Sequence, residues 1–355
     1  MSDVYFIKAA GLSDESLASG LKSLIDSENL FSFIEEKDMV AVKSHFGETP
    51  LSGYPRPVFL KTIGGIIKAK NALPFLTETS TLYKGNRNNA VIHTEHALRQ
   101  GFGYENTEMP IIMADGLLGD EELEVRIDGR IFSSVNIASL IVKAQAFVCV
   151  SHFTGHMMAG FGAAIKNMGM GCASRKGKLV QHSTVKPSIN REACVRCGEC
   201  VIWCPAGAVV MTPQGSSIDP HQCIGCGECL AVCRFDAVEF SWDATFENLQ
   251  KRIAEHALGV YKSTAGKGIY INILTRISKD CDCMPTYENI CPDIGLLVSR
   301  DPVAVDSASL DLVEKASLRS LRDIAYDIPC RFQVDYAAEL GMGSAKYRLV
   351  NFQLS

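Results

Sequence analysis

Two stretches of the chain repeat one spacing of cysteines, and this repeat restricts the possible folds more than any other feature of the sequence. Each stretch has the pattern C-x2-C-x2-C-x3-C. The two runs are Cys194, Cys197, Cys200 and Cys204, and Cys223, Cys226, Cys229 and Cys233. Short apolar pairs follow both runs at the same offset, at Ala208-Val209 and Ala237-Val238, so the segment is an internal duplication.

This spacing is typical of bacterial two-cluster ferredoxins, in which the fourth cysteine of each run ligates the other [4Fe–4S] cluster. One cluster is therefore predicted at Cys194, Cys197, Cys200 and Cys233, and the other at Cys223, Cys226, Cys229 and Cys204. Two zinc sites are the alternative, but zinc ribbons use two distant cysteine pairs rather than three cysteines in a row. Pro205 follows the first run, whereas Arg234 occupies the equivalent position after the second run. A positive charge favours the reduced, more negative cluster, so we predict a higher reduction potential for the cluster beside Arg234.

The overall composition argues against nucleic acid and membrane partners. The net charge is −5, the pI is about 5.9, and no stripe rich in Lys and Arg offers a phosphate-binding surface. No apolar run approaches the roughly 18 residues that a membrane-spanning helix needs. The first residues lack the basic and apolar regions of a signal peptide. We therefore expect a cytoplasmic protein whose 14 cysteines serve as reduced thiolate ligands rather than as disulfides.

Segments with strand and helix patterns alternate on both sides of the cysteine-rich region. Apolar residues recur at helical spacing over 14–25 and 58–68. The predicted strands are Val4–Lys8, Met39–Lys43, Leu73–Leu76, Pro110–Met113, Ala146–Val150, Gly268–Leu274 and Ile294–Ser299. The alternation predicts an α/β fold with a mostly parallel sheet and helices on both faces. We expect this domain in two parts, 1–186 and 243–355, with a ferredoxin-like (α+β) two-cluster domain inserted at 187–242.

A second candidate site lies in the Gly-rich segment 151–182, which follows the predicted strand Ala146–Val150. Open α/β sheets place their ligands at the carboxyl ends of parallel strands. Taken singly, each histidine of this segment is more often a structural residue than a ligand, and His152 and His156 could equally be a surface pair on a helix. The predicted catalytic residues, gathered from several strand ends, are His45, Glu48, Glu78, His152, His156, Lys166 and Asn167. There His and Lys side chains would supply protons or hold a small anionic substrate.

The six cysteines outside the two runs divide into two groups. Cys281 and Cys283 face the same side of an extended chain and could chelate a metal with Cys291 and Cys172, as a third metal or cluster site. Buried thiols and a thiol/disulfide couple are the alternatives. Cys149 and Cys330 are assigned to packing.

Long motifs in a fixed order make the chain resemble the uncharacterised iron–sulfur centre proteins grouped as domain of unknown function 362. The motifs are V-K-S-H-F-G-E (42–48), T-E-T-S-T-L-Y-K-G (77–85), A-D-G-L-L-G (114–119), the segment 151–174, the two cysteine runs, C-D-C (281–283) and 293–306. Thr154 departs from the lysine expected in this family. The resemblance implies an α/β body with an inserted two-cluster domain, but no reaction. The His/Gly/Lys segment is also similar to that of the nickel-pincer lactate racemases, as a fold-level analogy.

Our leading hypothesis is an electron-transfer protein or reductase component, which receives electrons from a redox partner protein and delivers them to the candidate site in the α/β domain. One alternative is a pure ferredoxin-type carrier without its own catalytic site, for which the His152 region should be packed or buried. The other is a non-redox, metal-dependent isomerase whose clusters are structural. The full Gly spacing of a dinucleotide-binding motif is missing at Gly160-Phe161-Gly162, so no nicotinamide or flavin is indicated.

Overall fold

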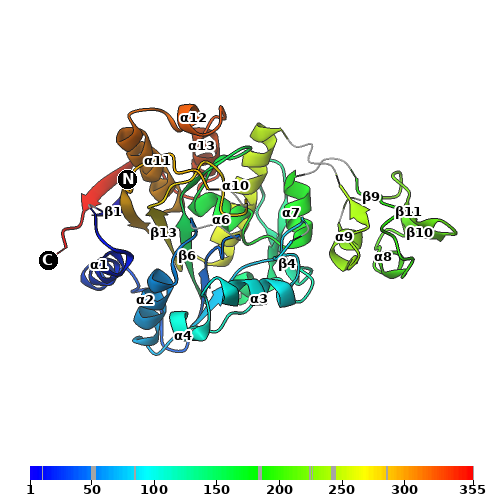
Figure 1. Ribbon diagram of the computed structural model, residues 1–355, viewed down its shortest axis with the longest axis horizontal. Coiled ribbons are helices and arrows are strands. Elements are labelled where there is room, and N and C mark those ends of the chain that lie inside the picture. The colour runs from blue at the N-terminus through cyan, green and yellow to red at the C-terminus, as the bar shows by residue number, and fades with distance from the viewer. Residues whose placement is uncertain are drawn as a thin grey trace.

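The computed structural model describes residues 1–9, 11–48, 53–83, 85–182, 186–223, 225, 227–240, 245–284 and 287–354. These residues form a large α/β body and a small lobe at one end of it (Figure 1). The lobe carries seven of the eight cysteines of the two runs. The eighth, Cys226, lies outside the described residues.

A seven-stranded sheet with the order β15-β1-β14-β13-β6-β2-β3 forms the centre of the body. Its strands are β1 (Ser2–Lys8), β2 (Met39–Lys43), β3 (Leu73–Thr77), β6 (Ala146–His152), β13 (Gly268–Leu274), β14 (Gly295–Ser299) and β15 (Tyr347–Asn351). Among these described strands only β14 runs against its neighbours. The prediction of an α/β fold with a mostly parallel sheet is therefore confirmed.

The sheet is buried on both faces, and β6 shows how its sequence achieves this. All seven residues of β6 are buried, as in strands that helices cover on both sides. Successive side chains point to opposite faces. Phe147 and Cys149 accordingly belong to one apolar core, and Val148 and Val150 belong to the other.

Helices cover both faces of the sheet (Figure 1). One core includes side chains of α1 (Asp14–Ser27), α2 (Pro57–Lys68) and α3 (Ala90–Arg99), with α4 (Tyr104–Thr107) packed against α2. The other core is covered by α5 (Ser139–Lys143), α6 (Ala164–Gly169), α10 (Phe246–Ser263), α11 (Pro302–Ser317), α12 (Leu321–Ile324) and α13 (Arg331–Glu339). The predicted helix at 14–25 buries Leu17, Leu21 and Leu24 and is capped by Ser13, whose hydroxyl accepts from Ser16 N at 3.2 Å.

One predicted strand is wrong. The segment Pro110–Met113 makes a single bridge, between Ile111 and Leu76 of β3. Leu76 N donates to Pro110 O, and Ile112 N donates to Leu76 O, each at 2.9 Å. Proline has no amide hydrogen, and the chain leaves the sheet edge after this one pairing. Two short hairpins, β4 (Glu122–Arg126) with β5 (Ser134–Ala138) and β7 (Thr154–His156) with β8 (Gly160–Gly162), complete the body.

The small lobe is inserted between β6 and β13, which are neighbours in the sheet. Its elements are β9 (Ser188–Ile189), α8 (Glu199–Ile202), β10 (Val209–Thr212), β11 (Gly215–Ile218), α9 (Glu228–Val232) and β12 (Val238–Glu239). The strands pair as β9 with β12 and β10 with β11, both antiparallel. The lobe approaches the body where α9 packs on α7 (Arg175–His182).

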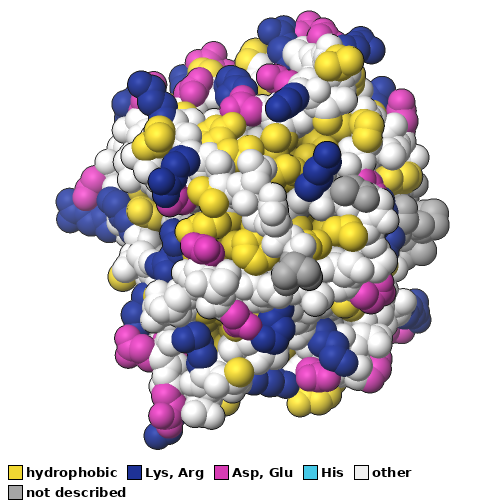
Figure 2. Space-filling view, turned by 90° about the vertical axis from the view of Figure 1, so that its left-hand side faces the viewer, with side chains coloured by type: hydrophobic (Ala, Val, Ile, Leu, Met, Phe, Trp, Pro, Cys, Tyr) yellow, Lys and Arg dark blue, Asp and Glu magenta, His cyan; other side chains and the backbone are white. Residues whose placement is uncertain are grey.

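Charged residues of both signs cover the face of the body that lies opposite the lobe (Figure 2). At the end of the body opposite the lobe, Lys, Arg, Asp and Glu side chains are interspersed around an apolar band (Figure 2). Among the helices of the described residues, none combines the length and the apolar composition needed to cross a bilayer.

Candidate functional site

Two cavities lie in the small lobe, and each is lined by cysteines of both runs. The first has Cys194, Cys197, Cys200 and Cys233 in its walls. The second has Cys223, Cys229 and Cys204, with Gly227 and Glu228 beside them. Both cavities are small and partly open to solvent. In each cavity, the fourth cysteine of one run therefore meets cysteines of the other run.

Backbone amides point at the sulfurs in the same way at both cavities. Ala208 N donates to Cys204 Sγ at 3.2 Å, and Ala237 N donates to Cys233 Sγ at 3.3 Å, so the duplicated sequence gives duplicated contacts. A backbone hydrogen bond from Ser216 lowers the pKa of Cys194, because it stabilises the thiolate. Thiolates held by amide donors suit a metal centre of soft ligands.

Among the described residues, the four cysteines predicted as a third metal site are not grouped around one position. Cys281 and Cys283 are joined to each other by a disulfide, with their Cα atoms 5.3 Å apart. Cys172 is fully buried in the body, where its thiol donates to Asn167 O at 3.7 Å. In the part of the chain that the structure describes, no three His, Cys, Asp or Glu side chains converge on a single ion. The disulfide alternative is the one observed for Cys281 and Cys283.

The carboxyl ends of β3, β2, β6 and β13 lie side by side in the body, as the candidate site requires. Lys43, the last residue of β2, is buried and lies 2.7 Å from Glu78 Oε1, which follows β3. Lys43 Nζ also donates to Asn167 Oδ1 at 2.7 Å. Asn167 Nδ2 donates to Ser151 Oγ at 3.0 Å. Three strand ends and α6 are thus connected through one buried ammonium and one amide.

The loop after β2 meets a buried arginine that sequence reasoning did not find. Arg87 Nη1 lies 2.8 Å from His45 Nε2, and Arg87 Nε lies 3.3 Å from Glu48 Oε2. Arg87 also donates to the hydroxyl of Tyr83. Burial and the charge of Arg87 hold the pKa of His45 well below its ordinary value, so this ring is neutral at pH 7. The tripeptide N-R-N around Arg87 has no periodic pattern that could have singled it out.

His152 is fixed between two oxygen acceptors rather than presented to a ligand. Its Nδ1 lies 2.8 and 3.0 Å from the two carboxylate oxygens of Asp282, and its Nε2 lies 2.9 Å from Thr275 O. The side chain has no exposed surface. A ring held on both nitrogens has no free position for a metal, and it connects the end of β6 to the loop that contains Asp282.

His156 and Lys166 keep polar atoms available. His156 Nδ1 accepts from Met158 N at 3.1 Å and from Ala159 N at 3.0 Å. Burial, reinforced by the charge of Lys166, holds the pKa of His156 well below its ordinary value. Burial also lowers the pKa of Lys166 to about 8, against the opposing charge of Asp282. Among the described residues, no carboxylate pairs with the Lys166 ammonium.

The carboxylate of Asp306 holds the N-terminus of α6, the helix that carries Lys166 and Asn167. The carboxylate of Asp306 accepts from Ala164 N at 2.9 Å and from Ile165 N at 2.8 Å, which are amides of the first helical turn. Asn272 of β13 donates to the same carboxylate at 2.7 Å. The sequence marked Asp306 only as the end of a family motif, because its partners lie far away along the chain.

α7 connects the lobe to the strand ends. Lys176 lies 3.3 Å from Glu228, beside the second cavity, and 3.1 Å from Glu122 of the body. Lys178, two residues later, donates to Thr79 Oγ1 at 2.6 Å, one residue after Glu78. A single helix therefore contacts the wall of a cysteine-lined cavity and the loop of the candidate site.

These features define an α/β protein with a cysteine-rich lobe inserted between neighbouring strands of its sheet. The model of the domain of unknown function DUF362 matches residues 40–311, more than half of the chain, and the chain belongs to this family. No curated protein matches it.

Two solved structures are similar at low levels. The lactate racemase apoprotein from Thermoanaerobacterium thermosaccharolyticum is 17% identical, with a TM-score of 0.36, over 52% of this chain and 41% of that one. A protein from Thermotoga maritima is 10% identical, with a TM-score of 0.44, over 88% of this chain and 59% of that one. The chain thus spans less than two thirds of either structure, and at these TM-scores neither likeness carries an argument about function.

Proposed function

We propose that this protein is an iron–sulfur redox protein that delivers electrons to a small anionic substrate at the strand ends of its α/β body. The single observation that carries the proposal is the pair of cavities in the lobe. Each is lined by cysteines of both runs, in the crossed arrangement that two [4Fe–4S] clusters need.

The residues of the lobe fit such clusters. When bound, [4Fe–4S] clusters supply one-electron transfer. The thiols surround a cavity instead of meeting at one point, which suits a cube of four irons better than a single zinc ion. The amides of Ala208 and Ala237 would stabilise negative charge on the sulfurs, and such hydrogen bonds set cluster potentials.

Lys166 is the group that we assign to the substrate. Lys43 is already paired with Glu78, and Arg87 with Glu48, so their charges are balanced within the protein. The ammonium of Lys166 is opposed only by longer-range charges such as that of Asp282. A half-buried cation without a carboxylate partner favours an anionic ligand, because the ligand would offset the cost of partly burying the charge. The neutral ring of His156 would add a hydrogen bond.

The position of α7 supports a route from the lobe to this site. Leu179 packs against Gly227, where a Cβ would lie 2.8 Å from Leu179 Cδ2, and Lys178 contacts Thr79. The cavity that contains Cys223, Cys229 and Cys204 is therefore the one beside the body. We assign it to the cluster that hands electrons to the body, and the other to the cluster that receives them from a redox partner protein.

The test is an anaerobic preparation analysed for iron, acid-labile sulfide and zinc, followed by redox titration. We expect about eight irons per chain and two one-electron steps. In Lys166→Gln we expect unchanged iron content and weakened binding of a small anion such as sulfite. Colourless protein that contains only zinc would overturn the proposal. Clusters that cannot be reduced and reoxidised would instead support a non-redox isomerase.

A pure electron carrier is the second candidate, and one observation favours it. His152 is fully packed, as expected if the body has no catalytic site. The two candidates differ in what Lys166 does. A carrier would deliver electrons to an acceptor protein equally well with Lys166→Gln, whereas a reductase would lose turnover with its clusters intact.

A further inference from the structure

The Cys281–Cys283 disulfide has no part in the function proposed above, although it lies at the same strand ends. The two cysteines belong to the connection between β13 and β14. Asp282, between them, is held by Nδ1 of His152, the last residue of β6. Met284 N donates to Cys281 O at 3.0 Å, so the backbone is fixed on both sides of the pair. The disulfide thus lies in a turn that one backbone hydrogen bond closes and that Asp282 connects to β6.

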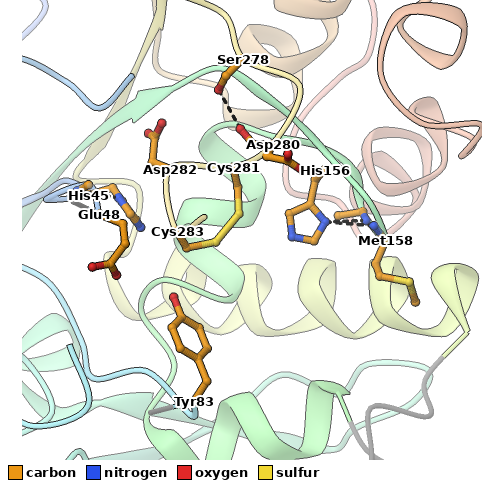
Figure 3. The surroundings of a disulfide bond; sticks show 12 residues. His45, Glu48, Tyr83, His156, Met158, Ser278, Asp280, Cys281, Asp282 and Cys283 are labelled. Atoms are coloured by element: carbon orange, nitrogen blue, oxygen red, sulfur yellow. Dashed lines mark hydrogen bonds between the residues drawn. A yellow bond between two sulfur atoms is a disulfide. The ribbon is translucent and has the colours of Figure 1, made fainter. Parts of the chain in front are cut away.

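Groups of the candidate site surround this disulfide. Figure 3 shows His45, Glu48, Tyr83 and His156 around the two sulfurs. The strand that carries His156 runs against the cysteine loop, since Gly155 N donates to Ser278 O at 2.8 Å. A Cβ at position 155 would lie 2.3 Å from Lys279 O, so only glycine allows this approach.

His156 offers a donor on this side of the site. Its Nδ1 accepts two backbone amides, so the proton of the neutral ring is on Nε2. No described residue accepts a hydrogen bond from Nε2. Figure 3 shows the ring turned towards the sulfur pair. A free N–H there can stabilise a thiolate, which is the reactive form of cysteine.

We propose that Cys281 and Cys283 are a redox-active couple of this site, which stores an electron pair for the anionic substrate. In its reduction the S–S bond breaks and each sulfur gains one electron and one proton, giving two thiols. The electrons come one from each reduced [4Fe–4S] cluster, and the protons come from water. The substrate then takes the pair and the disulfide forms again. This inference rests on the proposed function, since the clusters are the reductant.

The stoichiometry supports the couple. Two one-electron centres deliver the two electrons that one disulfide takes up, so the pair converts single electrons into a two-electron step. The difference in solvent exposure between Cys281 and Cys283 indicates which sulfur meets the substrate. Cys281 is 9% exposed and Cys283 is more exposed, so Cys283 faces the incoming substrate and Cys281 closes the bond again.

Thiol labelling of the cluster-loaded protein tests the proposal. Iodoacetamide should label neither Cys281 nor Cys283 before reduction, and both after reduction of the clusters with dithionite under argon, as read by peptide mass. The same dithionite treatment of Cys197→Ala/Cys229→Ala, which lacks a ligand of each cluster, should leave both unlabelled. Cys291→Ser, a change of another buried cysteine in the same loop, should behave like the unchanged protein.

The outcomes separate this inference from the proposed function. If both clusters cycle and the disulfide stays unlabelled, the inference is overturned and the function stands. If no clusters assemble, the function fails, and labelling after dithiothreitol still reports whether the couple exists. Free thiols in untreated protein would overturn the couple directly.

His156→Gln tests the positioning residue. We expect reduction of the disulfide to slow by about tenfold, the worth of one hydrogen bond to a charged group. Cluster potentials should not change. His221→Gln, in an exposed turn of the lobe, is the matched control and should leave the rate unchanged. An equal rate in His156→Gln would overturn the assignment of this ring to the couple.

Discussion

The body and the lobe are stabilised in different ways. The body has two extended apolar cores, one on each face of its sheet. Among its described residues the lobe has one small core of seven residues, of which Leu82 and Leu179 come from the body and two are cysteines of the runs. A unit of this size rarely folds on apolar burial alone and usually adds a metal or a cross-link. From this difference we expect the body to fold by itself, whereas the lobe would depend on a metal centre bound in its cavities.

Removing the clusters should therefore affect the largest number of residues, and the effect should be confined to the lobe. We expect the amides of β10 and β11 to lose hydrogen-exchange protection by at least about a hundredfold, or about 2.7 kcal/mol. The amides of β6 and β13 should keep theirs, because their burial does not involve the cavities. Exchange measured by mass spectrometry, before and after chelation, checks this. Equal losses in both parts would mean that the comparison is wrong.

In the body, the free energy of unfolding should depend on the buried ion pair between Lys43 and Glu78. Lys43 and Glu78 are 0% and 4% exposed and 2.7 Å apart. Glu78→Gln leaves the ammonium without a charged partner, and breaking such a pair costs about 3–5 kcal/mol. Urea unfolding followed by circular dichroism measures the loss. Asp26→Asn, which breaks the exposed pair with Lys22, is the control and should change stability little. A small effect of Glu78→Gln would show that water reaches the site.

The sequence predicted the part of the fold that depends on local periodicity. Helical spacing at 14–25 and the apolar run of β6 depend only on nearby residues, and both were found. The reversed direction of β14 was not predicted, because strand direction depends on partners elsewhere in the chain. The same limit explains Pro110–Met113, whose pairing is set by the edge of β3.

The candidate site was predicted unevenly for the same reason. Lys43, unlike Glu78 and Asn167, was not among the predicted residues, although it joins them. Arg87 and Asp306 act through partners far away in sequence, which no motif reveals. That His152 is catalytic stays a prediction, and its contact with Asp282, 130 residues later, could not be predicted from the sequence. A sequence shows which side chains can do chemistry, whereas three-dimensional packing decides which are already occupied.

The pH dependence of anion binding tests whether the Lys166 ammonium of the body binds the anion. Burial lowers the pKa of Lys166 to about 8 from 10.5. The ammonium that would bind the anion is therefore complete below pH 8 and is lost as the pH rises through that value. Affinity for sulfite, measured by calorimetry, should fall up to about tenfold per pH unit above 8. Lys22→Gln should not alter the profile, while Lys166→Gln should abolish the pH dependence. A profile that rises with pH would assign Lys166 as a base instead.

The two cavities of the lobe differ in the charge of Arg234, which follows a cysteine of the first cavity. Removing this charge should give the smallest of the predicted effects. Arg234 follows Cys233, which lines the first cavity, whereas Pro205 follows Cys204 at the second. A positive charge favours the reduced and more negative cluster, but Arg234 is exposed and solvent weakens its field. Arg234→Gln should lower the potential of the first cluster by a few tens of millivolts at most, which corresponds to less than about 1 kcal/mol for one electron.

Redox titration followed by electron paramagnetic resonance resolves the two clusters and measures this shift. Arg234→Lys keeps the charge and should restore the potential, while Pro205→Gln changes no charge and should leave the second cluster unaltered. The shift should shrink in about 1 M salt, where screening acts over about 3 Å. If the second cluster moves instead of the first, Cys233 does not serve the first cavity, and the crossed arrangement of the two runs is wrong.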